Sequence, residues 1–246
     1  MTATGVTPEI VLENFLILWF PYSQVYQNAI MATNREVFDE IAEGWYNYRH
    51  WSRFSEELET LASRWQTGRL LNIGCAHGPD FLPFKSGFEL HGVDFSARMI
   101  ALARKYAAKF DFAADLAVAD ALCLPYRNDT FDYAIAVASY HHIGGKEQGL
   151  RAFKELHRVL KPGGEAFITV WNKWQPRFIW SGKEVYVPWK SKGNTVQRYH
   201  YLYTFFELKN VLQATGFRIV DAPPVVSDSF PGKLFSRNIV VLVRAD

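Results

Sequence analysis

The strongest constraint on the fold is the alternation of short apolar stretches with segments of helical periodicity. The stretches Leu70–Ile73 and Phe131–Ala138 are apolar almost throughout, as expected of strands buried on both faces of a parallel sheet. Leu90–Val93 is interpreted as the second strand. The segments Ala97–Ala108 and Glu147–Leu160 repeat apolar residues at helical spacing. Strands that alternate with helices predict a doubly wound α/β fold with right-handed crossovers.

The remaining patterns complete a mostly parallel, seven-stranded sheet. We expect the other strands and helices at Leu116–Ala119, Glu165–Trp171, Arg218–Asp221, Asn238–Val243, Arg53–Trp65 and Phe205–Thr215. No helix separates the last two strands, so they are predicted to form an antiparallel pair at the C-terminal edge of the sheet. Residues 172–203 are rich in Trp, Tyr and Lys and fit none of these elements. We interpret them as an insertion that serves as a substrate lid.

The N-terminal 34 residues are set apart from the predicted domain, residues 35–246. Their apolar run, Ile10–Phe20, has 11 residues, whereas a membrane span needs roughly 20. No Lys or Arg precedes Arg35, so the basic region of a signal peptide is missing. We expect either a buried or partner-covered helix here, or an extension upstream of a true start at Met31, and no membrane association.

Charge and cysteine content bound the partners and the compartment. Residues 144–200 carry 11 Lys and Arg against 4 Asp and Glu, whereas residues 1–143 carry 11 against 17. A basic segment on a slightly acidic body indicates an anionic partner such as a phosphate backbone, unless it is only a solvated lysine-rich face. Cys75 and Cys123 alone cannot form a disulfide framework or a Cys-based zinc site, and they fit a reducing, cytoplasmic compartment.

The residues that end the first three strands indicate a nucleoside site. The first turn reads Asn72-Ile-Gly-Cys-Ala-His-Gly78, and its small residues let the backbone approach a ligand at the carboxyl end of the sheet. Asp94 ends the second strand, where a carboxylate can accept hydrogen bonds from both hydroxyls of a ribose. Asp120 ends the third strand and precedes Ala121, where side-chain and backbone groups can pair with an adenine edge.

The same turn fits a dinucleotide poorly. Asp94 does lie 20 residues after Gly74, as the fingerprint of nicotinamide enzymes prefers. However, Ala76 and Asp80 occupy the second and third glycine positions of that fingerprint, and a pyrophosphate needs the close approach that glycine allows. The remaining alternative is that Asp94 and Asp120 are ordinary strand-end caps.

Two later motifs resemble those of class I S-adenosylmethionine-dependent methyltransferases. They are Asp120-Ala-Leu-Cys-Leu-Pro125 and His157-Arg-Val-Leu-Lys-Pro-Gly-Gly164, and the resemblance spans Leu70–Val170. It implies a Rossmann-like fold and S-adenosyl-L-methionine as cofactor. The implied cofactor site comprises Asn72, Gly74, Ala76, Gly78, Asp94, Phe95, Asp120, Ala121 and Ala138. The family usually has an acidic residue where Asn72 stands and a glycine where Ala76 stands.

The exit of the fourth strand, Ala138-Ser-Tyr-His-His-Ile143, restricts the acceptor chemistry. It contains neither the Asn/Asp-Pro-Pro-aromatic motif of exocyclic-amine methyltransferases nor the Pro-Cys nucleophile of pyrimidine C5 chemistry. Apart from the pair His141 and His142, no general base is evident. The pair is not expected to bind a metal, because no third ligand is suggested, and it could simply cap the sheet. These features suit an acceptor that is already nucleophilic, such as a carboxylate.

Several segments resemble the tRNA wobble-uridine carboxymethyl methyltransferases, whose members esterify 5-carboxymethyluridine. The matching segments are Val37-Phe-Asp-Glu-Ile-Ala42, Ala136-Val-Ala-Ser-Tyr-His-His-Ile143, Val170-Trp171, Val185-Tyr-Val-Pro-Trp-Lys190 and Arg198-Tyr-His-Tyr-Leu-Tyr203. The resemblance implies that Arg49, His142 and Arg198 act at the catalytic site, holding the carboxylate and nearby anticodon phosphates. It also implies two partners, a tRNA anticodon stem-loop and a small zinc-binding activator protein.

Other interpretations stay open at this level. Arg49 could pair with Glu43 on a helix surface, and Arg198 could be a solvated basic residue. The chain could also be a methyltransferase acting on a small molecule such as a quinone or fatty acid, or a catalytically silent binding module of the same fold. If tRNA is the partner, the basic residues expected to hold it are Lys173, Arg177, Lys183, Lys190 and Lys192.

Overall fold

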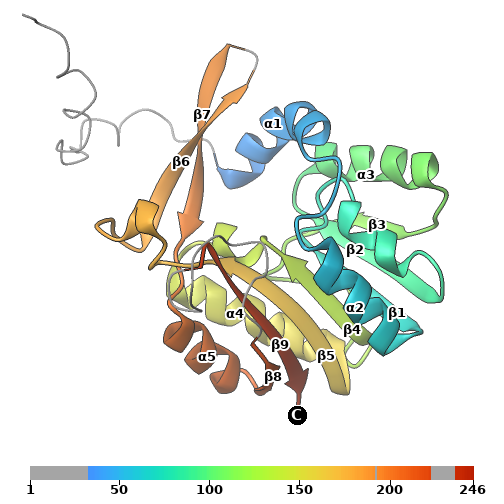
Figure 1. Cartoon of the computed structure of the whole chain (residues 1–246). Helices are drawn as coiled ribbons and strands as arrows, with labels where there is room; N and C mark the ends of the chain where they lie inside the picture. Colours follow the sequence, from blue (N-terminus) through green and yellow to red (C-terminus); the bar gives the residue numbers. More distant parts are fainter. Residues whose placement is uncertain (1–32, 192, 223–235) are drawn as a thin grey trace, which may run out of the picture. The chain divides into compact units, whose positions relative to one another are not determined.

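The computed structural model describes residues 33–191, 193–222 and 236–246. At its centre lies a seven-stranded sheet with the strand order β3-β2-β1-β4-β5-β9-β8 (Figure 1). The strands are β1 (Gly68–Ile73), β2 (Phe88–Asp94), β3 (Asp115–Val118), β4 (Phe131–Val137), β5 (Leu160–Trp171), β8 (Phe217–Asp221) and β9 (Asn238–Ala245). The apolar run Ile10–Phe20 lies outside the described residues.

The strand pairing confirms the predicted topology. Strands β1 to β5 pair in parallel, whereas β9 is antiparallel to both β5 and β8. The reversal of strand order between β1 and β4 creates a switch point at the carboxyl ends of these strands. Ligands of doubly wound folds bind at such a point.

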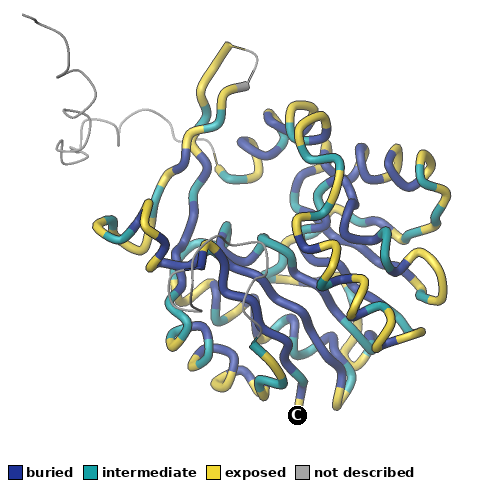
Figure 2. The backbone as a smooth tube through the Cα atoms, in the orientation of Figure 1, coloured by how far each residue is buried: buried dark blue, intermediate teal, exposed yellow. Residues whose placement is uncertain are grey.

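Helices cover both faces of the sheet because neighbouring strand residues point in opposite directions. Leu70 packs in a core cluster with α2 (Ser55–Trp65), while Leu71 packs with α4 (Gly145–Val159) and α5 (Phe205–Ala214). Both leucines are fully buried, and Figure 2 shows the central strands buried along most of their length. This two-sided burial explains why the strand sequences are apolar without alternation.

Two further helices complete the wall above the switch point. Helix α3 (Ala97–Phe110) begins at Ser96, whose hydroxyl accepts the N–H of Met99, as expected of an N-cap residue. Helix α1 (Asn34–Tyr48) packs on α3 through an apolar cluster that includes Phe38, Ile41 and Tyr106. Among the described helices, none combines the length and hydropathy needed to cross a membrane.

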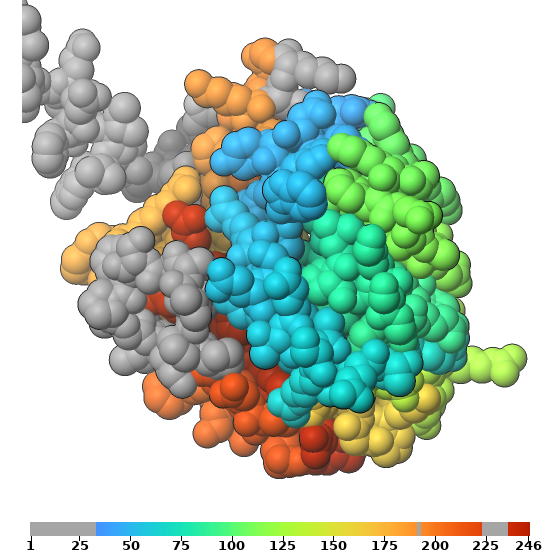
Figure 3. Space-filling model, turned by 45° about the vertical axis from the view of Figure 1, so that its right-hand side comes forward, coloured from blue at the N-terminus to red at the C-terminus, as the bar shows by residue number. Residues whose placement is uncertain are grey.

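The predicted insertion contains structure of its own. After a short 3-10 turn, η5 (Pro176–Phe178), the chain forms a separate antiparallel hairpin of β6 (Glu184–Ser191) and β7 (Asn194–Tyr201). The sequence analysis did not assign these strands. Figure 3 shows α1 and the segment that follows it, in blue, lying between the orange hairpin and green α3. The hairpin and α1 contact through Trp189 and Trp45, whose ring centroids are 5.2 Å apart.

Candidate active site

One pocket collects most of the predicted site residues. It lies at the switch point, and its walls come from the turn after β1, the ends of β2 and β4, the end of α1, and β7. Ten of the twelve predicted residues line it, namely Arg49, Gly74, Ala76, Asp94, Phe95, Asp120, Ala121, Ala138, His142 and Arg198. The other two do not line the pocket: Asn72 belongs to β1, and Gly78 belongs to the turn after it.

The turn after β1 is held against the exit of β4. Gly74 has a φ of +70°, and a Cβ at this position would clash with the Cβ of Ser139. The N–H groups of Gly74 and Cys75 both donate to the carbonyl of Val93, at 2.8 and 3.0 Å. Glycine is therefore required at position 74, because the end of β1 and the exit of β4 approach each other closely there. This contact forms the floor of the pocket.

Asp94 is fixed at the end of β2 by two backbone donors. Its Oδ2 accepts the N–H of Ala76 and its Oδ1 accepts the N–H of Ser96, both at 2.9 Å. Burial raises the pKa of Asp94 to about 6 against the effect of these hydrogen bonds, and the nearby Asp39 raises it further. Each carboxylate oxygen has a second lone-pair site, so the ionised side chain can still accept the two hydroxyls of a ribose.

The end of β3 offers the geometry expected for a base. Asp120 Oδ1 accepts the N–H of Leu122 at 2.9 Å, which fixes the turn that carries Ala121. Phe95 packs against Phe38 with ring centroids 5.6 Å apart, and it lines the pocket together with Asp120 and Ala121. The successive strand ends therefore fit the ribose and adenine parts of a nucleoside cofactor.

Two guanidinium groups in the pocket have no ion-pair partner among the described residues. The guanidinium carbon of Arg198 lies 5.0 Å from the Trp189 ring centroid and 5.5 Å from that of Trp45, and Arg49 lies 4.7 Å from Trp45. Arg198 is 7% exposed, so it is not the solvated residue considered above. Nor does Arg49 form the ion pair with Glu43 considered above.

Burial affects the charge of both arginines. Loss of hydration lowers the pKa of Arg49 and of Arg198 to about 10, and the charge of Arg49 contributes to the lowering at Arg198. Both stay cationic at neutral pH. A buried charge is costly unless it is paired, and the indole faces compensate only in part. The pocket therefore has the electrostatics of an anion site.

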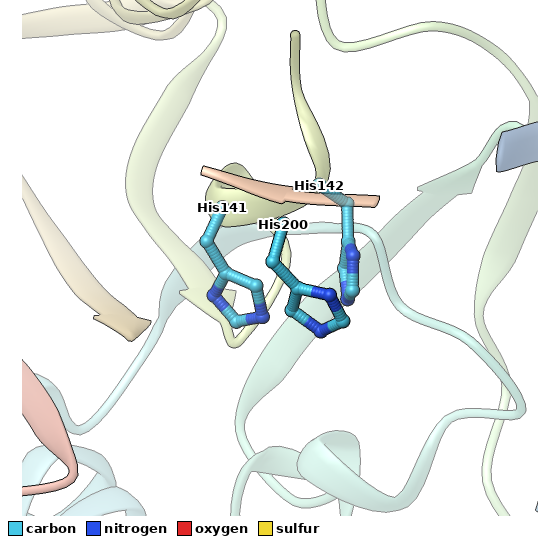
Figure 4. A group of neighbouring side chains, drawn as sticks. All are labelled: His141, His142 and His200. Atoms are coloured by element: carbon cyan, nitrogen blue, oxygen red, sulfur yellow. The ribbon is translucent and has the colours of Figure 1, made fainter. Parts of the chain in front are cut away.

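Three histidines that line the same pocket lie next to one another (Figure 4). His141 and His142 form the short turn η4 (Tyr140–His142) after β4, and His200 lies on β7. One ring nitrogen from each lies within 4.8 Å of the others. Burial lowers the pKa of all three, so the imidazoles are neutral at pH 7.

Among the pocket residues that sequence analysis did not assign to the site are His200 and Asp80. A signal for His200 was present, because it follows Arg198 by two residues and side chains at that spacing share one face of a strand. Asp80 was noted only as a departure from the dinucleotide pattern. It is 8% exposed and lines the pocket, and burial raises its pKa to about 6.

The basic residues of the insertion do not act as a group. Lys173 is buried, and its Nζ donates to the carbonyls of Phe178 and Ile179 at 2.8 and 3.1 Å, so the expectation that it contacts phosphate is wrong. Lys183 pairs with Glu207 at 2.8 Å, and Lys192 lies outside the described residues. Arg177 and Lys190 are exposed.

Comparisons with known proteins agree with this architecture. Residues 70–164 match a family model described as a methyltransferase domain. The chain is 34% identical over 120 residues to the bovine "Probable tRNA methyltransferase 9B", covering 49% of this chain and 25% of that protein. It is also 34% identical over 139 residues to the mouse "tRNA (carboxymethyluridine(34)-5-O)-methyltransferase ALKBH8", covering 55% of this chain and 19% of that protein. The chain thus spans a quarter or less of the length of these relatives.

A solved structure shares the fold over most of its length. The Burkholderia thailandensis 1,6-didemethyltoxoflavin-N1-methyltransferase, solved with S-adenosylhomocysteine, superposes with a TM-score of 0.63 at 17% identity, covering 93% of this chain and 94% of that one. The matched segment is therefore a methyltransferase domain on a sheet of the Rossmann-like class I topology, and this match indicates S-adenosylmethionine as the cofactor. Within that class it resembles the tRNA methyltransferases named above.

Proposed function

We propose that the protein esterifies the carboxylate of 5-carboxymethyluridine at the wobble position of tRNA. The observation that carries the proposal is the pair Arg49 and Arg198, two largely buried cations in the pocket that also contains Asp94. Neither forms an ion pair within the described part of the chain, and the buried Asp80 interacts with Arg49 only beyond ion-pair distance. A substrate anion would neutralise the two cations. The names of the relatives supply the candidate anion, since the mouse protein is named for carboxymethyluridine.

In this reaction the main contribution of the protein is to position the two reactants. S-adenosylmethionine supplies an electrophilic methyl group, so a carboxylate oxygen forms the O–CH₃ bond while the C–S bond breaks and S-adenosylhomocysteine leaves. Holding the two reactants in attack geometry can lower the barrier by about 7–11 kcal/mol. On this proposal Gly74, Asp94 and Asp120 position the cofactor, and the arginines position the acceptor.

The placement of the cations matters as much as their charge. A guanidinium can form two parallel hydrogen bonds with a carboxylate, but a cation on the attacking oxygen would stabilise the ground state and slow the reaction. Arg198 is therefore assigned to the carboxylate oxygen that does not attack. The tryptophans Trp45 and Trp189 hold its guanidinium plane and help to exclude water from the pocket.

The proposal also includes the two macromolecular partners. Arg177, Lys190 and Trp180, which is 95% exposed, belong to the insertion beside the pocket and suit the phosphates and bases of an anticodon stem-loop. For the zinc-binding activator, β3 is the natural docking element, because it is an edge strand in the described sheet and its Val118 is 49% exposed. Strand β4, by contrast, lies in the middle of the sheet and offers no edge for docking.

The deciding assay uses labelled cofactor and two tRNAs that differ in one group. One carries 5-carboxymethyluridine at the wobble position, and the other carries unmodified uridine there. We expect a base-labile methyl ester on the first tRNA alone. A base-stable product, or equal labelling of both tRNAs, would overturn the proposed substrate and leave the methyltransferase fold and cofactor unaffected.

A further inference from the structure

The hydrogen bonds of His142 and His200 fix which ring nitrogen carries the proton. His142 Nδ1 lies 3.0 Å from the carbonyl oxygen of Tyr199, and His200 Nδ1 lies 2.9 Å from that of Arg198. A carbonyl can only accept, so Nδ1 donates in both residues. Since both imidazoles are neutral, each Nε2 is left with a free lone pair. Figure 4 shows the two rings side by side.

His141 has the opposite arrangement. Its Nδ1 accepts the backbone N–H of Trp171 at 3.3 Å, so the proton of the neutral ring lies on Nε2, which is a donor. The three rings therefore present two acceptors and one donor. All three residues line the pocket together with Arg198.

His200 Nε2 is the group that still needs a partner. The residue is fully buried, and no hydrogen bond reaches this atom from the described residues. A buried acceptor left without a donor costs free energy, and this one lies in the wall of a ligand pocket, so a donor on the acceptor substrate would relieve the cost.

A metal ion fits this cluster less well than a hydrogen-bonding ligand. Three histidines within 4.8 Å could hold a divalent cation, but such a site needs three free lone pairs and the Nδ1 lone pair of His141 is engaged by Trp171. In addition, the positive charge of Arg198 opposes protonation of all three rings. The same field would oppose a dication.

We propose that His141, His142 and His200 read the imide edge of the acceptor base. The acceptor pair His142 and His200 receives the N3–H of uracil, and His141 Nε2–H donates to a flanking carbonyl. This inference rests on the proposed function, because it takes the base to be the one that carries the carboxylate. Cytosine has a lone pair at N3, which would face the histidine lone pairs and be rejected.

The experiment compares stem-loops carrying 5-carboxymethyluridine, 5-carboxymethylcytidine or N3-methyl-5-carboxymethyluridine. All three offer the same carboxylate, so differences report on the base edge. We expect kcat/KM to be at least about a hundredfold higher for the first, since a site built to hydrogen-bond a substrate group strongly rejects analogues that lack it. His200→Gln, whose amide can donate or accept, should reduce the preference over cytosine at least about tenfold. His157→Gln, outside the pocket, is the matched control and should retain it.

A second measurement does not depend on turnover. Long-range ¹H–¹⁵N NMR spectra of the histidine rings should show Nδ1–H for His142 and His200 and Nε2–H for His141. The opposite tautomers, equal turnover of the uracil and cytosine substrates, or stoichiometric zinc binding that His200→Gln abolishes would each overturn the inference. If cofactor binds but neither carboxymethylated base is methylated, the proposed function fails. The protonation pattern in the NMR spectra then remains the test of this inference.

Discussion

Arg49 and Arg198 lie against the same indole ring, that of Trp45, with guanidinium carbons 4.7 and 5.5 Å from its centroid. One arginine follows α1 and the other lies on β7, so the contact joins the N-terminal helix to the inserted hairpin. An indole face can hold a cation without neutralising it. The ring therefore brings two positive charges to one wall of the pocket while leaving both available to an anion.

We expect Arg198→Lys to reduce turnover without weakening cofactor binding. A lysine keeps the charge but cannot form two parallel hydrogen bonds with a carboxylate or stack as a plane between two tryptophans. One lost charge-assisted hydrogen bond, at about 1.5–3 kcal/mol, corresponds to a decrease in kcat/KM of roughly 10- to 150-fold. His142→Ala should cost less. Steady-state kinetics and calorimetry of S-adenosylmethionine binding measure the two quantities.

The matched control for this substitution is Arg151→Lys, which changes an exposed arginine on α4. It should leave kcat near the value of the unchanged protein. If Arg198→Lys were as active as that control, Arg198 would not bind the acceptor through both branches of its guanidinium.

Cofactor affinity should fall at acidic pH because of Asp94. Its pKa is raised to about 6, so without cofactor the side chain gains a proton as the pH drops below that value. The neutral acid has fewer acceptor sites for the ribose hydroxyls, so binding favours the ionised form and weakens by up to about tenfold for each pH unit below 6. Calorimetry across pH 4.5 to 8 measures the slope.

Asp80 requires a control, because its pKa is also raised to about 6 in the same pocket. Asp94→Asn should bind weakly and lose the pH dependence, whereas Asp80→Asn should keep it. If the slope disappears in Asp80→Asn and persists in Asp94→Asn, the ribose assignment of Asp94 is wrong.

The sequence was most informative where local pattern and global fold coincide. In Leu70–Ile73 only Asn72 could face water at low cost, so the segment must be a strand that is buried on both faces. A strand buried on both faces is typical of a parallel sheet. Given the sheet, Gly74, Asp94 and Asp120 had to meet, since they follow neighbouring strands at one edge. Fold and cofactor pocket could therefore be predicted together.

The acceptor side depends on contacts between segments far apart in the chain, and sequence patterns say little about them. Lys173 looked like a surface lysine, but two carbonyls of its own loop capture its ammonium group. His200 joins His141 only because β7 packs against the turn η4. No local pattern reveals the burial of Lys173, and the spacing of His200 from Arg198 indicates a shared strand face but not the contact with His141.

Binding of tRNA should depend on Arg177 and Lys190 but not on Lys173. The double variant Arg177→Ala with Lys190→Ala should lower the slope of log K against log salt by about 1 to 2, because each neutralised phosphate releases condensed counterions. Lys173→Ala should instead lower the melting temperature by removing the ties to Phe178 and Ile179. Filter binding at several salt concentrations measures the slope, and thermal denaturation measures the melting temperature. A slope unchanged in the double variant would place the tRNA elsewhere.

The exposed edge at β3 should be the docking site of an activator subunit. Val118→Lys adds a charge to an edge strand, a change that blocks strand pairing between chains. Because Val118 lies two residues before Asp120 of the pocket, cofactor affinity is measured as the control. We expect the variant to bind cofactor normally but to lose co-purification with the activator and the activity that depends on it. If the protein alone is monomeric and fully active on tRNA, no activator is needed.

Gly74→Ala should destabilise the protein and abolish cofactor binding through a steric clash rather than through backbone strain alone. Gly163 provides a matched comparison, because it too has a positive φ, +80°, but a Cβ there would meet nothing within 4 Å. At Gly74, with φ +70°, the added Cβ would meet the Cβ of Ser139. Backbone strain at either site costs about 1 kcal/mol, and the clash should add about 1–3 kcal/mol at Gly74 alone. Urea denaturation of both variants measures the difference.

Adding Ser139→Gly to Gly74→Ala should restore the part of the free energy of unfolding that is lost through the clash, but not the part lost through backbone strain. Equal destabilisation by the two alanine variants would show that the strand ends can separate freely.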